Sequence, residues 1–301
     1  MKNTAIKKLD ILETIKFIRK LVIIALFADD YLMNIFVLKG GNAIDIIFGI
    51  SDRASIDIDV SMADDFDSDK IEEIQQRLEK ALIQVFDDHS YHVFDVTLEA
   101  KPKVPYQEVK DFWGGYLLQF KVIERDKAQN TSHELMRKQA LAIGPGNSVK
   151  FKVDISKFEY CETKEETELD GYTIYVYTPV MVVFEKLRAI CQQMSNYTET
   201  IHQVPRPRAR DFFDIHRIIT KLNLDSQLFK EENLAILKAI FKAKHVPIEL
   251  LFKISQERDF HAGNFYSLKD TVSDKKSLKD FNFYFDYVLS LVKQLETFWK
   301  K

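Results

Sequence analysis

The pattern of apolar and polar residues divides the chain into a mixed first part and a helical second part. Apolar residues recur at helical spacing over 6–32 and 70–86, and His133 to Ile143 is also predicted to be helical. Runs rich in β-branched and aromatic residues predict strands at 92–98, 116–123, 149–155 and 172–177. After Pro179 the patterns are helical only, at 180–197, 210–223, 228–243, 247–257 and 278–300.

This order predicts an α+β fold, in which a mixed sheet with flanking helices is followed by an α-helical part. We expect two domains, residues 1–178 and residues 179–301. The length of 301 residues suits this division, and 46% hydrophobic residues are enough to bury a substantial core.

One predicted strand carries acidic residues that folding does not require. Asp57 and Asp59 alternate with Ile58 and Val60, so one face of the strand is apolar and the other carries two carboxylates. Carboxylates two residues apart leave the same face about 6–7 Å apart at the backbone, close enough to converge on one or two divalent ions. The alternative is a solvated edge strand.

Upstream of this strand, Gly40 and Gly41 permit a tight turn with exposed amides before the apolar run from Ala43 to Phe48. An anion such as a phosphate group can bind where a helix begins, and the hydroxyl of Ser55 could add a further contact. A glycine pair in front of a helix can also be nothing more than a turn.

Three charged residues later in the chain are candidates for the same chemistry. Lys186 lies beside the apolar stripe of its helix, where an ammonium group can reach over packed surface into a cleft. Asp211 lies along a buried stripe, so it must be paired, coordinated, or used as a helix N-cap. Asp154 is either a further catalytic carboxylate or part of the polar face of a one-sided strand. Asp214 can be a plain surface carboxylate.

Composition limits the function classes. A net charge of −3 argues against a protein that coats nucleic acid, so RNA binding must be local. The densest basic segment is Arg206-Pro207-Arg208-Ala209-Arg210, which presents guanidinium groups to phosphates or is simply a solvated loop. The two cysteines and seven histidines have no zinc-site spacing. No segment has the pattern of a membrane span or a signal peptide, so we expect a cytoplasmic protein.

Two groups of motifs resemble a known family. The string Leu38-Lys39-Gly40-Gly41, followed by Arg53-x-Ser55-x-Asp57-x-Asp59, resembles the opening motif of polymerase-β-like nucleotidyltransferases, and in particular their AbiEii/AbiGii toxin branch. Glu185-Lys186-Leu187-Arg188-Ala189 and then Arg210-Asp211-Phe212-Phe213-Asp214 are similar to the later signature of that branch. The likeness covers about residues 35–220. A longer basic insertion before Arg210 leaves open which arginine contacts phosphate.

The resemblance implies a magnesium- or manganese-dependent enzyme that transfers a nucleoside monophosphate from an NTP to a hydroxyl and releases pyrophosphate. It implies a toxin of a toxin–antitoxin or phage-defence pair, with an antitoxin partner and with tRNA favoured over protein as acceptor. The implied roles are metal binding by Asp57, Asp59 and Asp154, nucleotide binding by Gly40, Gly41, Arg53, Ser55 and Arg210, charge neutralisation by Lys186, orientation or deprotonation of the acceptor by Asp211 or Asp154, and RNA binding by Arg206 and Arg208.

Three alternatives remain. The chain could be a nucleotide-binding regulatory protein without turnover, although its complete motifs argue against that. It could be an interaction protein whose helical half is the active part. A metal-dependent nuclease is disfavoured, because such an enzyme needs neither the glycine turn nor a lysine for a triphosphate.

Overall fold

The computed structural model describes residues 2–50, 57–104, 106–142, 148–272 and 274–299. Within these residues, seven strands form one mixed sheet in the order β3-β4-β5-β2-β1-β7-β6. The pairs β2–β5 and β1–β7 are parallel and the other neighbours are antiparallel. The strands are β1 (Val37–Lys39), β2 (Ile58–Ser61), β3 (Tyr91–Lys101), β4 (Gly115–Glu124), β5 (Phe151–Ser156), β6 (Glu165–Leu169) and β7 (Tyr172–Val176).

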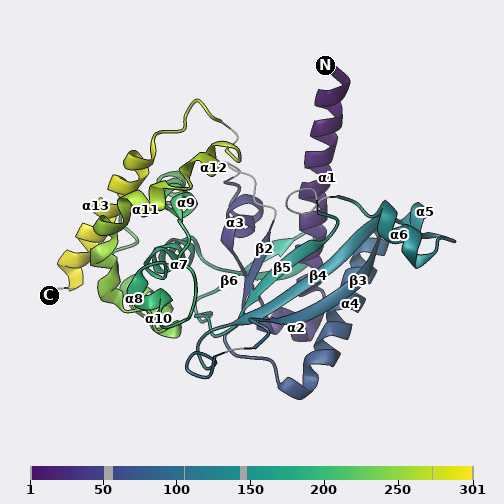
Figure 1. Cartoon of the computed structure of the whole chain (residues 1–301), viewed down its shortest axis with the longest axis horizontal. Helices are drawn as coiled ribbons and strands as arrows, with labels where there is room; N and C mark the ends of the chain where they lie inside the picture. Colours follow the sequence, from purple (N-terminus) through teal and green to yellow (C-terminus); the bar gives the residue numbers. More distant parts are fainter. Residues whose placement is uncertain (1, 51–56, 105, 143–147, 273, 300–301) are drawn as a thin grey trace.

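Two long helices bury the apolar face of this sheet (Figure 1). Helix α1 (Lys2–Phe27) and helix α4 (Ile71–Asp87) share one hydrophobic cluster with residues from β1, β2 and β5. Ile58 and Val60 are fully buried in that cluster, which confirms the predicted apolar face of the acidic strand. Shorter elements of this part are α2 (Asp30–Ile35), α3 (Gly40–Asn42), the π-helix η1 (Ala43–Ile47), η2 (Ser68–Lys70), α5 (Arg125–Ala128) and α6 (His133–Gln139).

A second hydrophobic cluster holds the helical half together. Helix α7 (Pro179–Cys191) begins where the Thr178 hydroxyl accepts a hydrogen bond from the Met181 N–H, with proline in the first turn. The other elements are α8 (Ser195–Thr198), α9 (Ala209–Leu222), α10 (Glu231–Ala243), the 3₁₀ segment η4 (Ile248–Glu257), α11 (Arg258–Ala262), α12 (Phe265–Lys269) and α13 (Phe281–Trp299).

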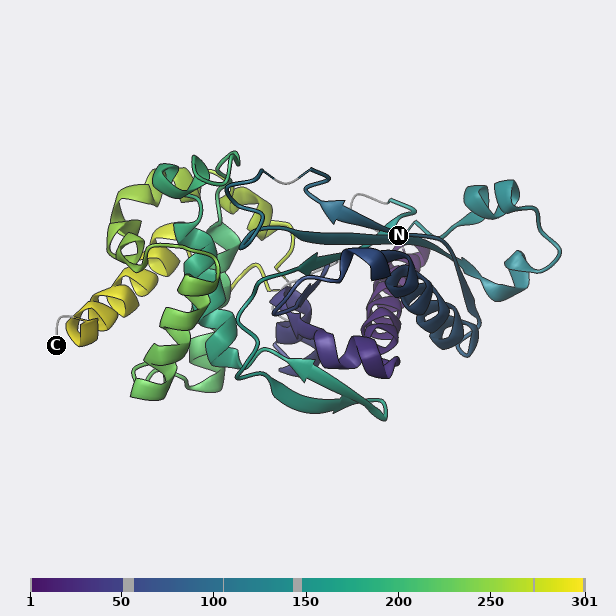
Figure 2. The same cartoon turned by 90° about the horizontal axis from the view of Figure 1, so that it is seen from below.

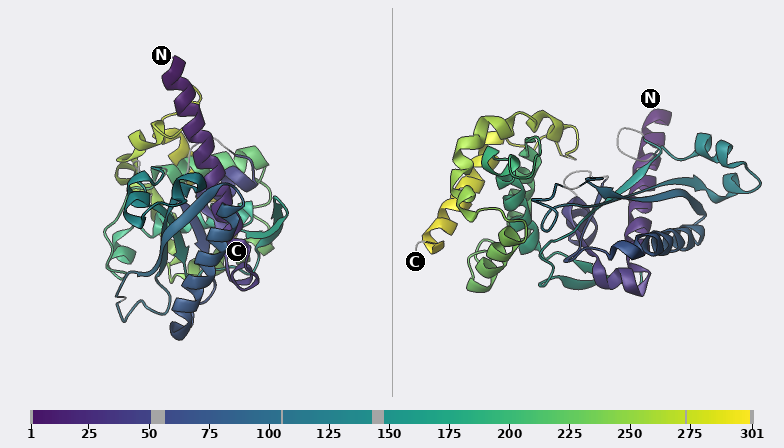
Figure 3. Two further views of the ribbon diagram at one scale, coloured as in Figure 1. Left: turned by 90° about the vertical axis from the view of Figure 1, so that its right-hand side faces the viewer. Right: turned by 60° about the horizontal axis from the view of Figure 1, so that its bottom comes forward.

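The helical half lies beside one end of the sheet, and α5 and α6 lie at the opposite end (Figures 2 and 3). Val109 and Phe112, from the connection between β3 and β4, are buried in the helical cluster, so the two halves share packing. This architecture confirms the predicted α+β class. The division into domains 1–178 and 179–301 stays a prediction.

Some elements differ from the sequence-based expectation. The predicted helix at 247–257 is a 3₁₀ segment, and α11, α12, β1 and β6 were not predicted. Strand β6 is rich in glutamate and lies at the edge of the sheet, so it shows no apolar alternation. None of the helices that the structure describes is long and apolar enough to cross a membrane.

Candidate active site

Charged residues from three neighbouring strands stand side by side on one face of the sheet. Lys39 on β1 is the register partner of Asp59 on β2, and Asp59 is the register partner of Asp154 on β5. Asp57 lies directly before β2, two residues from Asp59, so both project toward the same side. The structure therefore brings the predicted third aspartate next to the Asp-x-Asp pair.

This charged face opens into a cleft of about 940 Å³ against the helical half. Of the twelve residues that the sequence nominated, Arg53 and Ser55 lie outside the described residues. The other ten all line the cleft: Gly40, Gly41, Asp57, Asp59, Asp154, Lys186, Arg206, Arg208, Arg210 and Asp211.

The carboxylates of the cleft repel one another. Burial raises the pKa of Asp59 to about 6, against the attraction of Lys39, and the negative charges of Asp154 and Glu185 add to the effect. Burial and Asp154 also raise the pKa of Asp57. The ammonium group of Lys101 contacts the Asp154 carboxylate. A divalent cation bound among the three aspartates, in addition to the Lys101 ammonium group, would relieve the remaining repulsion between the carboxylates.

The donor set fits a magnesium ion that is completed by substrate. Among the residues described, no three His, Cys, Asp or Glu side chains form a metal-binding group as they stand. Magnesium in nucleotide enzymes is held by one or two carboxylates, with substrate phosphates and water supplying the other ligands. Adjacent Asp57, Asp59 and Asp154 meet that smaller requirement.

The glycine turn is in direct contact with the acidic strand. Gly40 has φ +70°, and a Cβ atom at this position would lie 2.5 Å from Oδ2 of Asp59. Both the backbone conformation and the space therefore require glycine. The side chain of Asn42, which the sequence reading did not nominate, donates a 2.5 Å hydrogen bond to the Asp57 carbonyl. The turn thus holds the backbone that carries Asp57 as well as facing the cleft.

Lys186 is buried between two carboxylates of α9. Its ammonium group lies 2.9 Å from Oδ1 of Asp211 and 2.7 Å from Oδ2 of Asp214. Burial alone would raise the pKa of Asp211, but Arg208 and Lys186 hold it below its usual value. The N-cap of α9 is Arg208, so the capping alternative for Asp211 is wrong. Asp214 is also buried, so its interpretation as a surface carboxylate is wrong as well.

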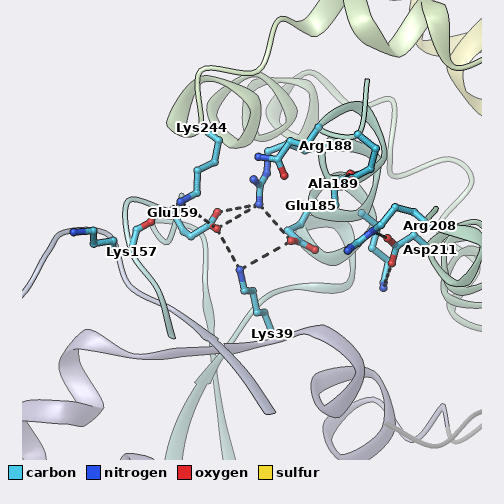
Figure 4. A network of polar contacts seen from close by, with 12 residues as sticks. Lys39, Lys157, Glu159, Glu185, Arg188, Ala189, Arg208, Asp211 and Lys244 are labelled. Carbon is cyan, nitrogen blue, oxygen red and sulfur yellow. Dashed lines mark hydrogen bonds and ion pairs between the residues drawn. The ribbon is translucent and has the colours of Figure 1, made fainter. Parts of the chain in front are cut away.

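A second group of buried charges joins the sheet to the helical half (Figure 4). The Glu159 carboxylate lies 3.3 Å from Lys39, 3.1 Å from Arg188 and 3.6 Å from Lys244. Arg188 also contacts Glu185 at 3.3 Å. Burial alone would raise the pKa of Glu159, but the three cations bring it to about 2. Burial lowers the pKa of Lys244 to about 8.

These five residues line the cleft, although the sequence did not predict them as site residues. Lys39, Glu185 and Arg188 lie within the motifs that resemble the family, so the motifs were the sequence signal that could have identified them. Glu159 and Lys244 carry no local signal, because their role depends on packing between distant elements.

The arginine segment is fixed to the helical half through its backbone. The Arg206 N–H donates to Oε1 of Gln193, and the Arg208 N–H donates to Nδ1 of His261. Asn264 bridges the segment, because its Oδ1 accepts from the Ala209 N–H and its amide donates to the Pro207 carbonyl. The Arg208 side chain is paired with Asp211, whereas Arg206 and Arg210 are exposed at the cleft. His261 and Asn264, which lie beyond the residues covered by the motif likeness, therefore help to position this segment.

Comparisons with known proteins place the chain in a family. The family model described as "Nucleotidyl transferase AbiEii toxin, Type IV TA system" matches residues 24–301. No curated protein matches the chain.

Solved structures resemble the chain over most of its length. A putative nucleotidyltransferase from H. pylori is 14% identical, with 95% of this chain and 96% of that one covered and a TM-score of 0.46. JHP933 from Helicobacter pylori is 15% identical, with 94% and 92% covered and a TM-score of 0.47. An antigenic nucleotidyltransferase-like protein from Paracoccidioides brasiliensis is 17% identical, with 73% and 92% covered and a TM-score of 0.33. At these TM-scores the likenesses carry no functional argument.

Proposed function

Because the chain belongs to the AbiEii family of nucleotidyltransferase toxins of type IV toxin–antitoxin systems, we propose that it transfers a nucleoside monophosphate from an NTP to a hydroxyl of RNA, with tRNA as the favoured acceptor. The single observation that carries this proposal is the meeting, in one cleft, of three adjacent aspartates with a glycine turn and exposed arginines. Carboxylates suit a metal–triphosphate, and arginines suit phosphates of the acceptor.

The proposed reaction forms one bond and breaks one. The acceptor oxygen attacks the α-phosphorus of the NTP, the bond from that phosphorus to the bridging oxygen breaks, and pyrophosphate leaves. Asp57, Asp59 and Asp154 would hold magnesium, which supplies charge stabilisation for the phosphates when bound. In this proposal Gly40 and Gly41 bind the triphosphate and Arg210 offsets its charge, while Arg53 and Ser55 keep the nucleotide-binding role that the sequence resemblance implies.

We assign the acceptor proton to Asp154 and a positioning role to Asp211. A carboxylate whose pKa is held low by two cations is a poor proton acceptor, which describes Asp211. Asp211 instead holds the ammonium group of Lys186 and the guanidinium group of Arg208 in defined positions beside the cleft. Asp154 contacts one cation of the described residues, Lys101, where Asp211 contacts two, and it is half-buried and lines the cleft, so it is the better placed of the two carboxylates to accept the proton.

The proposal is tested with each of the four NTPs, labelled at the α-phosphate, in the presence of magnesium and either total RNA, purified tRNA or a protein fraction. The expected result is labelled RNA with matching release of pyrophosphate, lost in Asp57→Asn. Label in protein instead would reassign the acceptor. Nucleotide binding without pyrophosphate release from any NTP would favour the regulatory-protein alternative.

We further propose that this activity arrests host growth in the cytoplasm, where NTP and RNA are both present, and that an antitoxin counteracts it. Induced expression of the wild-type chain should stop growth, and Asp57→Asn should not. Toxicity that survives Asp57→Asn would instead place the harmful activity in the helical half as an interaction surface.

A further inference from the structure

Two exposed rings, from two segments that each supply residues to the cleft, are in contact. The ring centroids of Tyr106 and His202 lie 4.3 Å apart, with 39° between their planes. Tyr106 belongs to the connection between β3 and β4, which also supplies Pro102 and Trp113 to the cleft. His202 belongs to the connection between α8 and α9, which supplies Gln203 and Arg206. The ring pair therefore joins two segments that both border the candidate active site.

Both segments are anchored, although their tips are exposed. Val109 and Phe112 are buried in the helical cluster, and Phe112 stacks on His245 with centroids 4.1 Å apart. On the other side, Ile201 is buried and the Arg206 backbone is bound to Gln193. Away from these anchors three apolar or aromatic side chains face solvent: Val104 is 82% exposed, Val204 79% and Tyr106 52%. Folding gives no reason to expose these apolar groups.

The second of these connections is basic, although the whole chain carries a net charge of −3. The first connection contains two lysines, Lys103 and Lys110, against two acids, whereas the second contains two arginines, Arg206 and Arg208, against one acid, Glu199. Arg210 follows the second connection in α9 and is also exposed at the cleft. A ring face beside guanidinium groups is the arrangement by which proteins bind unpaired nucleotides, because every base has a face that can stack and every phosphate is negative.

We propose that Tyr106 and His202 form a stacking platform for an unpaired base near the reacting end of the RNA acceptor, with Arg206 binding an adjacent phosphate. This inference rests on the proposed function and names the part of the RNA that the enzyme recognises: a single-stranded end. Base-paired RNA does not fit the platform, since its bases are already stacked on their neighbours.

The test uses short RNAs that carry 2-aminopurine, a base whose fluorescence falls on stacking, in a single-stranded 3′ end. Wild type should quench this fluorescence. Tyr106→Ala should lose the quenching and raise the KM for RNA roughly 5- to 100-fold, with the KM for NTP unchanged. Tyr106→Phe keeps the ring and should behave as wild type. Tyr172→Ala, at a tyrosine 39% exposed in the β6–β7 hairpin, is the matched control and should change neither value.

The inference fails if Tyr106→Ala and the double variant Tyr106→Ala/His202→Ala leave quenching and the KM for RNA unchanged. It also fails if the variants weaken the binding of blunt duplex RNA as much as the binding of RNA with a single-stranded 3′ end. The two proposals separate cleanly. Quenching by wild type without any transfer to RNA would overturn the proposed function and support the platform, whereas transfer to RNA that is indifferent to Tyr106 would do the reverse.

Discussion

The carboxylate of Asp59 occupies the space that a side chain at position 40 would need, since a Cβ on Gly40 would come within 2.5 Å of Oδ2 of Asp59. The turn and the acidic strand are therefore built against each other, and neither can move alone. Lys39, which directly precedes the turn, forms an ion pair with Glu159. Lys39 therefore connects the turn to the buried charges that join the sheet to the helical half.

This contact makes a substitution at the turn testable against a matched control. Gly40→Ala should lose most transfer activity and destabilise the fold by roughly 1–3 kcal/mol, because the backbone is strained and Asp59 is displaced. Gly49 also has a positive φ, of +68°, but has nothing within 4 Å of an added Cβ. Gly49→Ala should therefore show the backbone cost alone in thermal unfolding, with transfer retained. Equal loss of transfer in both variants would contradict the proposed contact.

Because the aspartates repel one another, removing one negative charge should stabilise the fold and abolish activity at the same time. Asp59→Asn should abolish transfer yet raise the stability of the metal-free protein by about 1–2 kcal/mol, because burial and neighbouring carboxylates disfavour the charged form of Asp59. Urea unfolding in a chelator, beside transfer assays with magnesium, measures both effects. A lower stability in Asp59→Asn would show that this carboxylate is structural.

The two carboxylates around Lys186 should differ in effect. Asp211→Asn breaks the contact with Arg208 as well as weakening that with Lys186, whereas Asp214→Asn leaves the Arg208 pair in place. We expect Asp211→Asn to raise the KM for RNA and NTP together, with a kcat that keeps the wild-type pH profile. Loss of kcat by roughly 100-fold or more, with a changed pH profile, would instead make Asp211 the proton acceptor.

Removal of the Glu159 carboxylate, which contacts three buried cations between the sheet and the helical half, should strongly destabilise the fold. Glu159→Gln leaves Lys39, Arg188 and Lys244 with fewer negative partners and should lower stability by about 3–5 kcal/mol at pH 7. The pKa of Glu159 in the folded chain, about 2, lies below its ordinary 4.5. Its contribution is therefore complete above pH 4.5 and is lost as the pH falls toward 2. The gap in unfolding free energy between wild type and Glu159→Gln should narrow only below about pH 4.5, and a gap that narrows already near neutral pH would contradict this.

Asn264 should matter for RNA rather than for nucleotide. Asn264→Ala removes both hydrogen bonds that bridge Pro207 and Ala209, so Arg206 and Arg208 are held less firmly, whereas Arg210 is held within α9. We expect a raised KM for RNA and an unchanged KM for NTP. Asn282→Ala removes a comparable side-chain hydrogen bond, to Arg258, outside the residues that line the cleft, and serves as the control. Unchanged use of RNA in Asn264→Ala would mean that the segment keeps its position without this bridge.

Much of the fold follows from local patterns, because side-chain periodicity is a property of a segment. The alternation of Asp57 and Asp59 with buried Ile58 and Val60 was readable before the partners of the strand were known. Strand β6 could not be predicted from its own sequence, since this polar edge strand is formed by pairing with β7 and not by burial of its own residues. The ten-residue segment η4 has a helical pattern, but the pattern does not distinguish a 3₁₀ segment from an α-helix.

For the candidate site, the sequence by itself determined which charged residues lack a folding reason: the Asp57–Asp59 pair, the helical Lys186, and Asp211 on a buried stripe. Only the tertiary structure decided their partners. The register of β2 with β5 puts Asp154 beside Asp59, and the packing of α7 on α9 encloses Lys186 between Asp211 and Asp214. Glu159, Lys244 and Asn264 entered the site in the same way. The reason is physical: a buried charge must find a partner wherever packing brings one, and that position depends on the whole fold.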